Sequence, residues 1–386
     1  MKYIVTNFAY GTGPYLRTTE LALAVNDRLE SLGHERLGII VPWVYGEKQK
    51  KIMLEEFSDF EIKHPGEILL DPKLGQLLKS IFYGDNSYEE ALSLWVNNYE
   101  SISDQAHKHF SGDIEVEDLK GDKQIVSGGD IIMEINRAPR IAYNIAPSYY
   151  TTFGHISEIL KNILSVPQNI IDVDRELVKQ AIPIAQKLEQ NNKMHFVAEP
   201  GTFSYVADRL PLYPTEHSAP PIARPPHPNN DEIKEGIFVT ITGIPGLERL
   251  YGEAEKLGLK LYSNDTQAVP GSEKLLPHVI PNPKIKLQFA RSGWGSVWIS
   301  QLSETPFVTP DFDAKDDPEI YFNNLCIEKL GLGIIYRGQS LAEIMAEAEK
   351  LRPKIQKINQ GLMAKFGTYD GNEFCAKFIV NDFLRK

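Results

Sequence analysis

Residues 2–41, KYIVTNFAYGTGPYLRTTELALAVNDRLESLGHERLGIIV, carry the pattern that decides the fold. A short apolar strand ends at Phe8 and is followed by a loop rich in glycine and proline. Apolar residues then recur at helical spacing over Arg17–Leu32, and Gly33 is placed to end this helix. Because a second apolar strand begins at Leu37, the chain opens with the strand, loop, helix and strand of a doubly wound sheet.

Strand and helix patterns alternate through most of the chain, which indicates the α/β class. The first half contains further predicted strands at 125–127, 131–135, 141–144 and 194–198. In the second half, a strand over 236–242, a helix over 247–257 and a strand over 259–263 repeat the opening order. The sequence therefore predicts two β/α halves.

A proline-rich segment separates the two halves. Seven of the twenty residues at 211–230 are proline, which excludes a helix or a central strand and favours an extended, semi-rigid chain. We expect an interdomain linker there, between a first domain at 1–210 and a second domain at 231–371; a long surface loop within one domain is the alternative. The last stretch, 372–386, is predicted to form an amphipathic helix.

Composition narrows the classes of function. Lys and Arg number 41 and Asp and Glu 52, a net charge of -11, so the basic surface that nucleic acid requires is not expected. The two cysteines, Cys326 and Cys375, form no CxxC pair, which argues against structural zinc or a disulfide framework. We expect a cytoplasmic protein, because the sequence has neither a signal-peptide pattern nor a long apolar run. Peripheral contact with a membrane stays open.

The strongest local signal is FARSGWGS at 289–296, where an apolar strand ends, glycines permit a tight turn and a helix is predicted to begin. The N–H groups at the start of a helix, together with the helix dipole, favour an anion. Gly293 and Gly295 would let a phosphate approach closely. Arg291 offers a bidentate fork and Ser296 a hydroxyl. A plain tight turn is the alternative interpretation of the same residues.

An acidic segment follows this signal along the chain. Five acidic side chains lie between Asp311 and Glu319, immediately before a predicted helix. Carboxylates there could accept hydrogen bonds from sugar hydroxyls. A solvated loop with acids in the first helical turn is the alternative, because the helix dipole favours acids at that place.

Together, residues 290–333 resemble the donor-binding segment of nucleotide-sugar glycosyltransferases of the GT-B fold. The likeness is closest to the UDP-glycosyltransferases and to the N-acetylglucosaminyltransferase that makes lipid II. It rests on SGWGS at 292–296, on TPFVTP at 305–310, and on IEKLGLG at 327–333 after an Asn-Asn pair. The loop at 11–13 is similar to the other half of the cleft in the same family.

The resemblance implies two Rossmann-like domains that face each other across a cleft, with the donor held mostly by the second. The final helix would return to the first domain. The phosphate-binding residues that it implies are Gly11, Thr12, Gly13, Gly243, Arg291, Ser292, Gly293, Trp294, Gly295 and Ser296. The residues that it implies for the sugar or ribose are Asp316, Asp317, Glu319 and Asn323.

The resemblance does not assign a catalytic base. Many inverting members of the family carry a His in the N-terminal loop, where this chain has Pro14 and Tyr15. An inverting transfer needs a carboxylate or a His near the acceptor hydroxyl. The candidates are Asp130, which follows two glycines, and His155, at a predicted helix start; a turn aspartate and a capping histidine are the alternatives.

We therefore predict a glycosyltransferase of the hexosyltransferase type that uses a nucleotide-diphosphate sugar, with UDP as the expected nucleotide. The acceptor, a lipid, a sugar or a small metabolite, is not indicated by any motif. No cofactor and no metal are expected, since the donor is a substrate and the loop at 289–296 would stabilise the leaving diphosphate. A nucleotide-sugar 2-epimerase on the same scaffold and a catalytically silent nucleotide-sugar binding protein are the alternatives.

Overall fold

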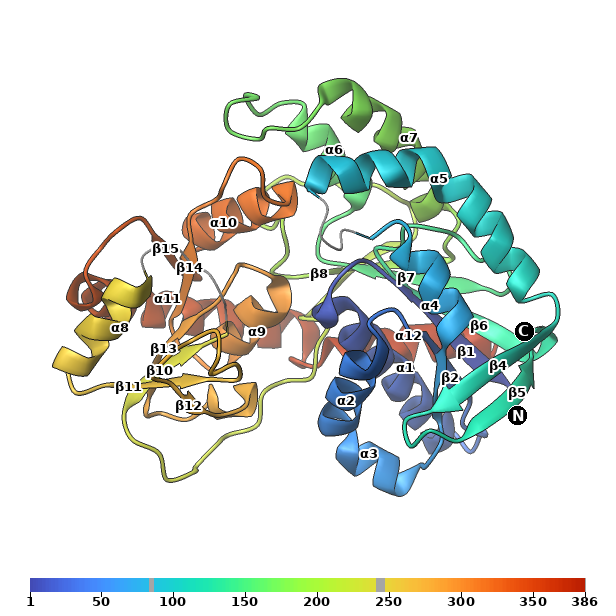
Figure 1. The fold of residues 1–386 in the computed structure, drawn as a ribbon, viewed down its shortest axis with the longest axis horizontal. Coiled ribbons are helices and arrows are strands. Elements are labelled where there is room, and N and C mark those ends of the chain that lie inside the picture. Colours follow the sequence, from blue (N-terminus) through green and yellow to red (C-terminus); the bar gives the residue numbers. More distant parts are fainter. Residues whose placement is uncertain (83–86, 241–246, 386) are drawn as a thin grey trace. The chain divides into compact units, whose positions relative to one another are not determined.

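The computed structural model describes residues 1–82, 87–240 and 247–385. The chain folds into two compact units, each built around its own sheet (Figure 1). Unit 1 contains Met1–Ala198, Leu210–Ile222 and Gly371–Lys386. Unit 2 contains Glu199–Arg209 and Ala223–Asp370.

The sheet of unit 1 has the strand order β5-β4-β3-β2-β1-β6-β7-β8-β9. Its strands are parallel, except that β4 is antiparallel to both β3 and β5. The strands are β1 Tyr3–Phe8, β2 Gly38–Pro42, β3 Ile68–Asp71, β4 Asp113–Asp118, β5 Lys123–Ser127, β6 Ile131–Arg137, β7 Ser148–Thr152, β8 Met194–Ala198 and β9 Glu216–Ala219. The helices are α1 Thr12–Ser31, α2 Gly46–Glu56, α3 Ser58–Lys63, α4 Pro72–Lys79, α5 Tyr88–His109, α6 Ile156–Ile163, α7 Arg175–Gln190 and α12 Gly371–Phe383.

The first helix, α1, begins at Thr12 rather than at the predicted Arg17. Pro14 falls in its first turn, where the missing N–H leaves no helical hydrogen bond unmade. Near the other end, Asn26 donates through Nδ2 to the carbonyl of Leu37 (2.7 Å) and accepts from its N–H (3.0 Å). These two buried bonds fix the end of α1 to the start of β2.

The described part of unit 2 contains a fully parallel sheet in the order β12-β11-β10-β13-β14-β15. Its strands are β10 Gly236–Val239, β11 Lys260–Ser263, β12 Glu273–Lys274, β13 Ile285–Phe289, β14 Phe307–Pro310 and β15 Gly333–Tyr336. Its helices are α8 Leu247–Lys256, α9 Trp294–Leu302, α10 Pro318–Leu330 and α11 Leu341–Phe366. Ile237, Leu287 and Ile344 belong to the core cluster between the sheet and its helices. The predicted capping box is present at the start of α11, where Ser340 and Glu343 bond reciprocally.

The prediction of a strand at 141–144 is wrong. The carbonyl of Arg140 accepts the indole N–H of Trp95 at 2.6 Å. The next carbonyl, that of Ile141, accepts Nδ2 of Asn7 at 2.8 Å. Side chains thus provide the hydrogen bonds that a neighbouring strand would otherwise supply, and the segment is an irregular loop.

The proline-rich segment is more than a linker. Its first part, Leu210–Ile222, belongs to unit 1 and contributes β9, which pairs in parallel with β8. The four residues of β9 include no proline, and a proline-flanked strand is tolerated at the edge of a sheet. Residues Glu199–Arg209, predicted to lie in the first domain, belong instead to unit 2.

Each sheet reverses its strand order at one place, between β1 and β6 in unit 1 and between β10 and β13 in unit 2. This order is that of a doubly wound sheet, so the predicted α/β class and the two Rossmann-like domains are confirmed. In such sheets, ligands bind outside the carboxyl ends of the strands at the switch point. The loops after β1, β6, β10 and β13 therefore occupy the positions at which this fold builds ligand sites.

Gly236 allows β10 to lie close to β11. A Cβ at this position would lie 2.4 Å from the carbonyl oxygen of Lys260 and 2.7 Å from the ring of Tyr262. We expect Gly236→Ala to lower the free energy of unfolding of unit 2 by about 1–3 kcal/mol in a urea titration. Gly252→Ala in α8 is the matched control, because its Cβ would meet nothing within 4 Å. Equal stability of the two variants would contradict this account.

Candidate functional site

The carboxyl ends of β10 and β13 are neighbours, because these strands pair in parallel up to Val239 and Phe289. The loop after β10 contains Gly243, one of the predicted phosphate-binding residues, which lies outside the described residues. The loop after β13 is described and leads from Ala290 into α9 at Trp294. The FARSGWGS motif therefore lies at the topological switch point of unit 2.

The first turn of α9 presents backbone N–H groups at this edge of the sheet. Gly293 is the N-cap residue, and no side chain in the described part of the chain caps the helix. The N–H groups of Ser296 and Val297 donate to the Gly293 carbonyl at 2.9 and 3.2 Å, whereas the N–H groups before them have no acceptor within the helix. Among the residues that the structure describes, a Cβ at Gly293 would meet nothing within 4 Å. This arrangement can hold an anion.

A buried amide on α10 holds the same loop in place. Asn323 donates through Nδ2 to the carbonyl of Ser292 (2.9 Å) and to Oε1 of Glu319 (3.0 Å). Its Oδ1 accepts from the indole N–H of Trp294 and from the hydroxyl of Thr202, both at 2.9 Å. Asn323 is fully buried, so each of these bonds is made away from water.

The acidic segment meets the loop through an ion pair. The guanidinium of Arg291 donates to Oδ2 of Asp316, and both side chains keep part of their surface exposed. Asp317 is the N-cap of α10 and accepts from the N–H of Glu319 at 2.9 Å. The structure thus brings together the glycine turn and the acidic segment, which are separated in the sequence by α9 and β14.

Some residues that the resemblance placed on the donor have another role in the structure. The side chains of Trp294 and Asn323 are buried and bonded to each other, so they position the loop instead of facing a ligand. Ser292 is also buried, and its Oγ has no hydrogen-bond partner among the described residues. The loop therefore offers a ligand mainly its backbone N–H groups and the guanidinium of Arg291.

In unit 1, the glycine loop after β1 lies beside the switch point with β6. Gly11 is the N-cap of α1 with φ of 113°, a conformation that glycine adopts without steric cost. Its N–H donates to the hydroxyl of Tyr45 at 2.7 Å, so this predicted phosphate-binding amide is already engaged. Burial raises the pKa of that hydroxyl, which therefore stays protonated at neutral pH. Thr12 and Gly13 are exposed in the first turn of α1.

Asp130, a candidate base, lies at the amino ends of the strands, whereas the glycine loop lies at their carboxyl ends. It immediately precedes β6, which runs parallel to β1 with Ile131 beside Tyr3. Its carboxylate forms an ion pair of 2.7 Å with Lys2 at the surface. The length of β1, roughly 20 Å at the usual rise per residue, separates it from the glycine loop. Asp130 therefore cannot act on a ligand held at the carboxyl edge.

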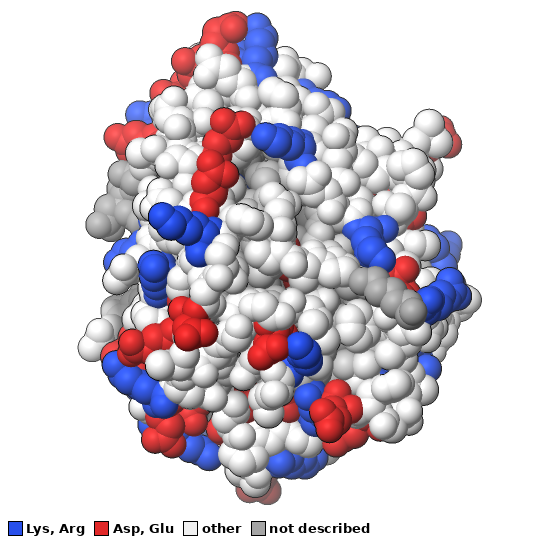
Figure 2. Space-filling model, turned by 90° about the vertical axis from the view of Figure 1, so that its right-hand side faces the viewer, with Lys and Arg blue, Asp and Glu red and all other residues white. Residues whose placement is uncertain are grey.

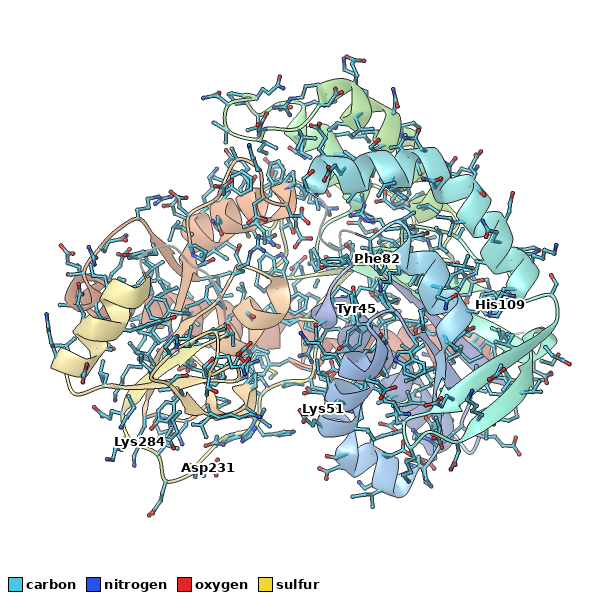
Figure 3. The ribbon with its side chains drawn as sticks, viewed as in Figure 1. Tyr45, Lys51, Phe82, His109, Asp231 and Lys284 are labelled. Carbon is cyan, nitrogen blue, oxygen red and sulfur yellow. The ribbon has the colours of Figure 1, made fainter. Side chains whose placement is uncertain are left out.

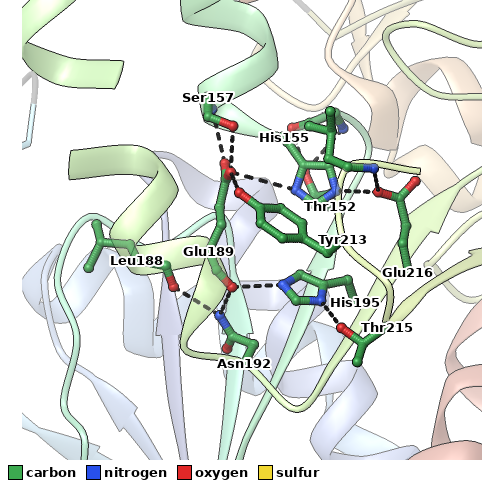
Figure 4. A network of polar contacts seen from close by, with 12 residues as sticks. Thr152, His155, Ser157, Leu188, Glu189, Asn192, His195, Tyr213, Thr215 and Glu216 are labelled. Atoms are coloured by element: carbon green, nitrogen blue, oxygen red, sulfur yellow. Dashed lines mark hydrogen bonds and ion pairs between the residues drawn. The ribbon is translucent and has the colours of Figure 1, made fainter. Parts of the chain in front are cut away.

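His155, the other candidate base, belongs to a buried polar network in unit 1 (Figure 4). Its Nε2 lies 3.0 Å from Oε2 of Glu216, and its ring stacks on Tyr150 with centroids 5.5 Å apart. The carboxylate of Glu189 accepts from the hydroxyl of Tyr213 at 2.7 Å in the same network. Because the imidazole is fully buried, the structure gives His155 a role in attaching the segment around β9 and does not expose it to a ligand.

Unit 1 also contains an aromatic hollow at the carboxyl edge of its sheet. The space between and in front of its side chains is about 270 Å³, including open solvent. The lining residues are Tyr10, Ile81, Phe82, Tyr88, Ala91, Leu92, Trp95 and Arg140. The ring of Tyr10 packs edge-on against Phe82 (5.9 Å) and Tyr45 (6.0 Å), and Figure 3 labels the last two at this end of the unit. Tyr10 and Arg140 belong to no local sequence motif that would mark them as lining residues.

Positively and negatively charged side chains are mixed on the face that Figure 2 shows. Lys and Arg side chains there alternate with Asp and Glu. Among the residues that the structure describes, no helix combines the length and the apolar character needed to cross a membrane.

No protein-family model and no curated protein matches this chain. Several solved structures do resemble it over its whole length. A UDP-glucosyltransferase from Polygonum tinctorium capable of glucosylating indoxyl, in complex with 3,4-dichloroaniline, has a TM-score of 0.62 at 12% identity and covers 100% of this chain and 99% of its own. UGT2 of Phytolacca americana, complexed with UDP-2fluoro-glucose and pterostilbene, has a TM-score of 0.58 at 12% identity and covers 100% of both chains.

UGT89C1 of Arabidopsis thaliana, complexed with UDP-L-rhamnose, is similar as well, with a TM-score of 0.59 at 11% identity and 99% of each chain covered. At such low identity the likeness establishes the fold. The chain therefore has the GT-B fold of nucleotide-sugar glycosyltransferases, as the motif at 290–333 predicted.

The buried amide of Asn323 provides a test of how the loop is held. We expect Asn323→Ala to lower the free energy of unfolding of unit 2 by about 2–3 kcal/mol, because it leaves several buried groups unpaired. Asn324→Ala is the matched control, since this neighbouring amide makes a single bond, from Nδ2 to the carbonyl of Pro310 (3.0 Å), and should cost about 1 kcal/mol. Urea titrations of both variants make the comparison. An equal loss would show that Asn323 has no special part in holding the loop.

Proposed function

We propose that this protein is a glycosyltransferase that transfers a sugar from a UDP-sugar to an acceptor bound by unit 1. One observation carries the proposal: the N-terminus of α9, which no side chain of the described residues caps, lies at the switch point of a Rossmann-like sheet. The nucleotide is supported by structures of the same fold, two of which are complexes with UDP-L-rhamnose and UDP-2fluoro-glucose.

In this proposal the donor diphosphate lies against the first turn of α9. The N–H groups of Trp294 and Gly295, with the guanidinium of Arg291, stabilise the charge that develops on the diphosphate as its bond to the sugar breaks. The anomeric carbon forms a bond to the acceptor oxygen, UDP leaves, and the hydroxyl proton passes to water. Fixed amides and one guanidinium supply the charge stabilisation, so the proposal needs no metal ion.

The sugar or ribose would be held by the acidic segment. Asp316 and Glu319 are both partly exposed and connected to the loop, Asp316 through Arg291 and Glu319 through Asn323. Carboxylate oxygens accept hydrogen bonds from hydroxyls, so these two side chains are suited to a sugar. Asp317 is less suited, because its carboxylate caps α10.

Gly293→Ala separates ligand binding from stability. The backbone at Gly293 (φ -68°, ψ 133°) suits alanine, so the variant should fold normally, but its methyl group would occupy the space proposed for phosphate. We expect UDP to raise the Tm of the wild type and of Gly361→Ala, a control whose Cβ also meets nothing within 4 Å, and to leave that of Gly293→Ala unchanged. Equal stabilisation of both variants by UDP would reject the site.

Arg291→Ala tests the role of the guanidinium in the reaction. We expect release of UDP from UDP-glucose, measured by a coupled assay with and without acceptor, to fall about 100-fold, as for loss of one oxyanion-stabilising donor. Arg337→Ala is the matched control, because its side chain is also 49% exposed and paired with an acid, Asp311. A similar rate for the two variants would remove Arg291 from the mechanism. UDP binding without any turnover would indicate a binding protein.

A further inference from the structure

The segment that follows β8 contains a buried stretch of irregular backbone. Residues 199–209 belong to unit 2, although the chain on either side of them belongs to unit 1. The four residues at 200–203 are all buried, and they form neither helix nor strand. Irregular segments usually lie at the surface, because their backbone polar groups need partners that a core rarely supplies. The partners of these groups therefore show what holds the segment.

Side chains of α9 and α10 supply those partners. The indole N–H of Trp298 in α9 donates to the carbonyl of Pro200 at 2.8 Å. The thiol of Cys326 in α10 donates to the carbonyl of Gly201 at 3.1 Å. The stretch 200–203 is thus held by the helix that begins after the glycine turn and by the helix that carries the buried amide described above.

The hydroxyl of Thr202 belongs to the network that holds the start of α9. It donates to Oδ1 of Asn323 at 2.9 Å, and its oxygen accepts the indole N–H of Trp294 at 3.1 Å. The same indole N–H also donates to Oδ1 of Asn323 at 2.9 Å, so the three polar groups form a closed triangle. All three side chains are buried. Because water does not replace a lost partner there, each bond restricts how the other two groups can turn.

This triangle orients the amide of Asn323. The torsion that turns a terminal amide is broad, so an amide held by one donor alone would keep freedom to rotate. With its oxygen held by two donors, its nitrogen faces the carbonyl of Ser292 at 2.9 Å, immediately before the first turn of α9. Thr202 therefore contributes to the direction of the N–H groups in that turn, although it lies 92 residues before Trp294 in the sequence.

We propose that Thr202 is a positioning residue of the donor site, so that the segment 199–209 is part of that site. The inference rests on the proposed function, since it concerns the turn that holds the diphosphate in that reaction. Thr202 acts through the amide of Asn323, which keeps the first turn of α9 in the orientation that the phosphate requires. A turn held in this way has less freedom to lose when the ligand binds, which favours affinity.

Amide hydrogen exchange of the free protein tests the positioning itself. The N–H groups of Gly293, Ser296 and Val297 are bonded within the turn, so their exchange reports its opening. We expect this exchange to be about 3- to 10-fold faster in Thr202→Val, in which a methyl group replaces the hydroxyl and one hydrogen bond is lost. Thr202→Ser keeps the hydroxyl and should exchange like the wild type.

Thr305→Val is the matched control. Thr305 is also buried in unit 2, and its hydroxyl also donates to a buried acceptor, the carbonyl of Ile280 at 2.9 Å. It precedes β14, however, and so lies at the amino ends of the parallel strands, away from the turn. We expect this variant to lose stability to urea, as Thr202→Val does, but to keep the exchange of the turn and the affinity for UDP.

Calorimetric titration of the full chain with UDP measures the consequence for binding. We expect Thr202→Val to bind UDP about 3- to 10-fold more weakly than the wild type, and Thr202→Ser to bind it equally well. Unchanged exchange in Thr202→Val, or an equal change in Thr305→Val, would overturn the proposal. Binding of UDP by the wild type with no loss in Thr202→Val would reject this inference alone. Absence of UDP binding by the wild type would reject the proposed function and this inference with it.

Discussion

The buried amide of Asn323 determines where the first turn of α9 begins. Its two ends bond to the carbonyl of Ser292 and to the indole of Trp294 at once, so the loop after β13 cannot shift without leaving buried polar groups unpaired. Loops at the carboxyl edge of a parallel sheet are otherwise free to vary. This one is tied to α10, and the backbone N–H groups at the start of α9 gain a fixed direction from that connection.

Much of the fold could be predicted from local patterns. The apolar run at Met194–Ala198 forms β8 with the predicted bounds, and Ser340 with Glu343 marks the start of α11. The predictions failed where distant side chains decide the backbone. The carbonyls of Arg140 and Ile141 are satisfied by Trp95 and Asn7, and no pattern within 141–144 reveals this. Tertiary contacts override local propensity in such segments.

For the candidate site, the sequence predicted the position of the turn but not the roles of individual side chains. The turn at Gly293 has a local signature, since a strand, a glycine and a helix follow one another. The side chain of Trp294 does not, because whether it faces a ligand or the core depends on Asn323. His155 was predicted from its place at the start of a helix, but its ring stacks on Tyr150 within the core. The residues that line the hollow around Arg140 come from four separate stretches of chain. No local sequence pattern could therefore predict the hollow.

Unit 1 is completed by the last helix of the chain. In α12, Asp382 accepts from the hydroxyl of Tyr149 at 2.8 Å, and Asn372 lies against Glu20 of α1. The amino-terminal sheet is therefore synthesised early, but the surface that α12 covers stays uncovered until unit 2 has been made. Contacts between residues so far apart in sequence also form slowly. Nascent chains of this protein should consequently pass through a long-lived intermediate that exposes apolar surface and is prone to aggregate. We therefore expect them to depend on chaperones more than a chain of this size usually does.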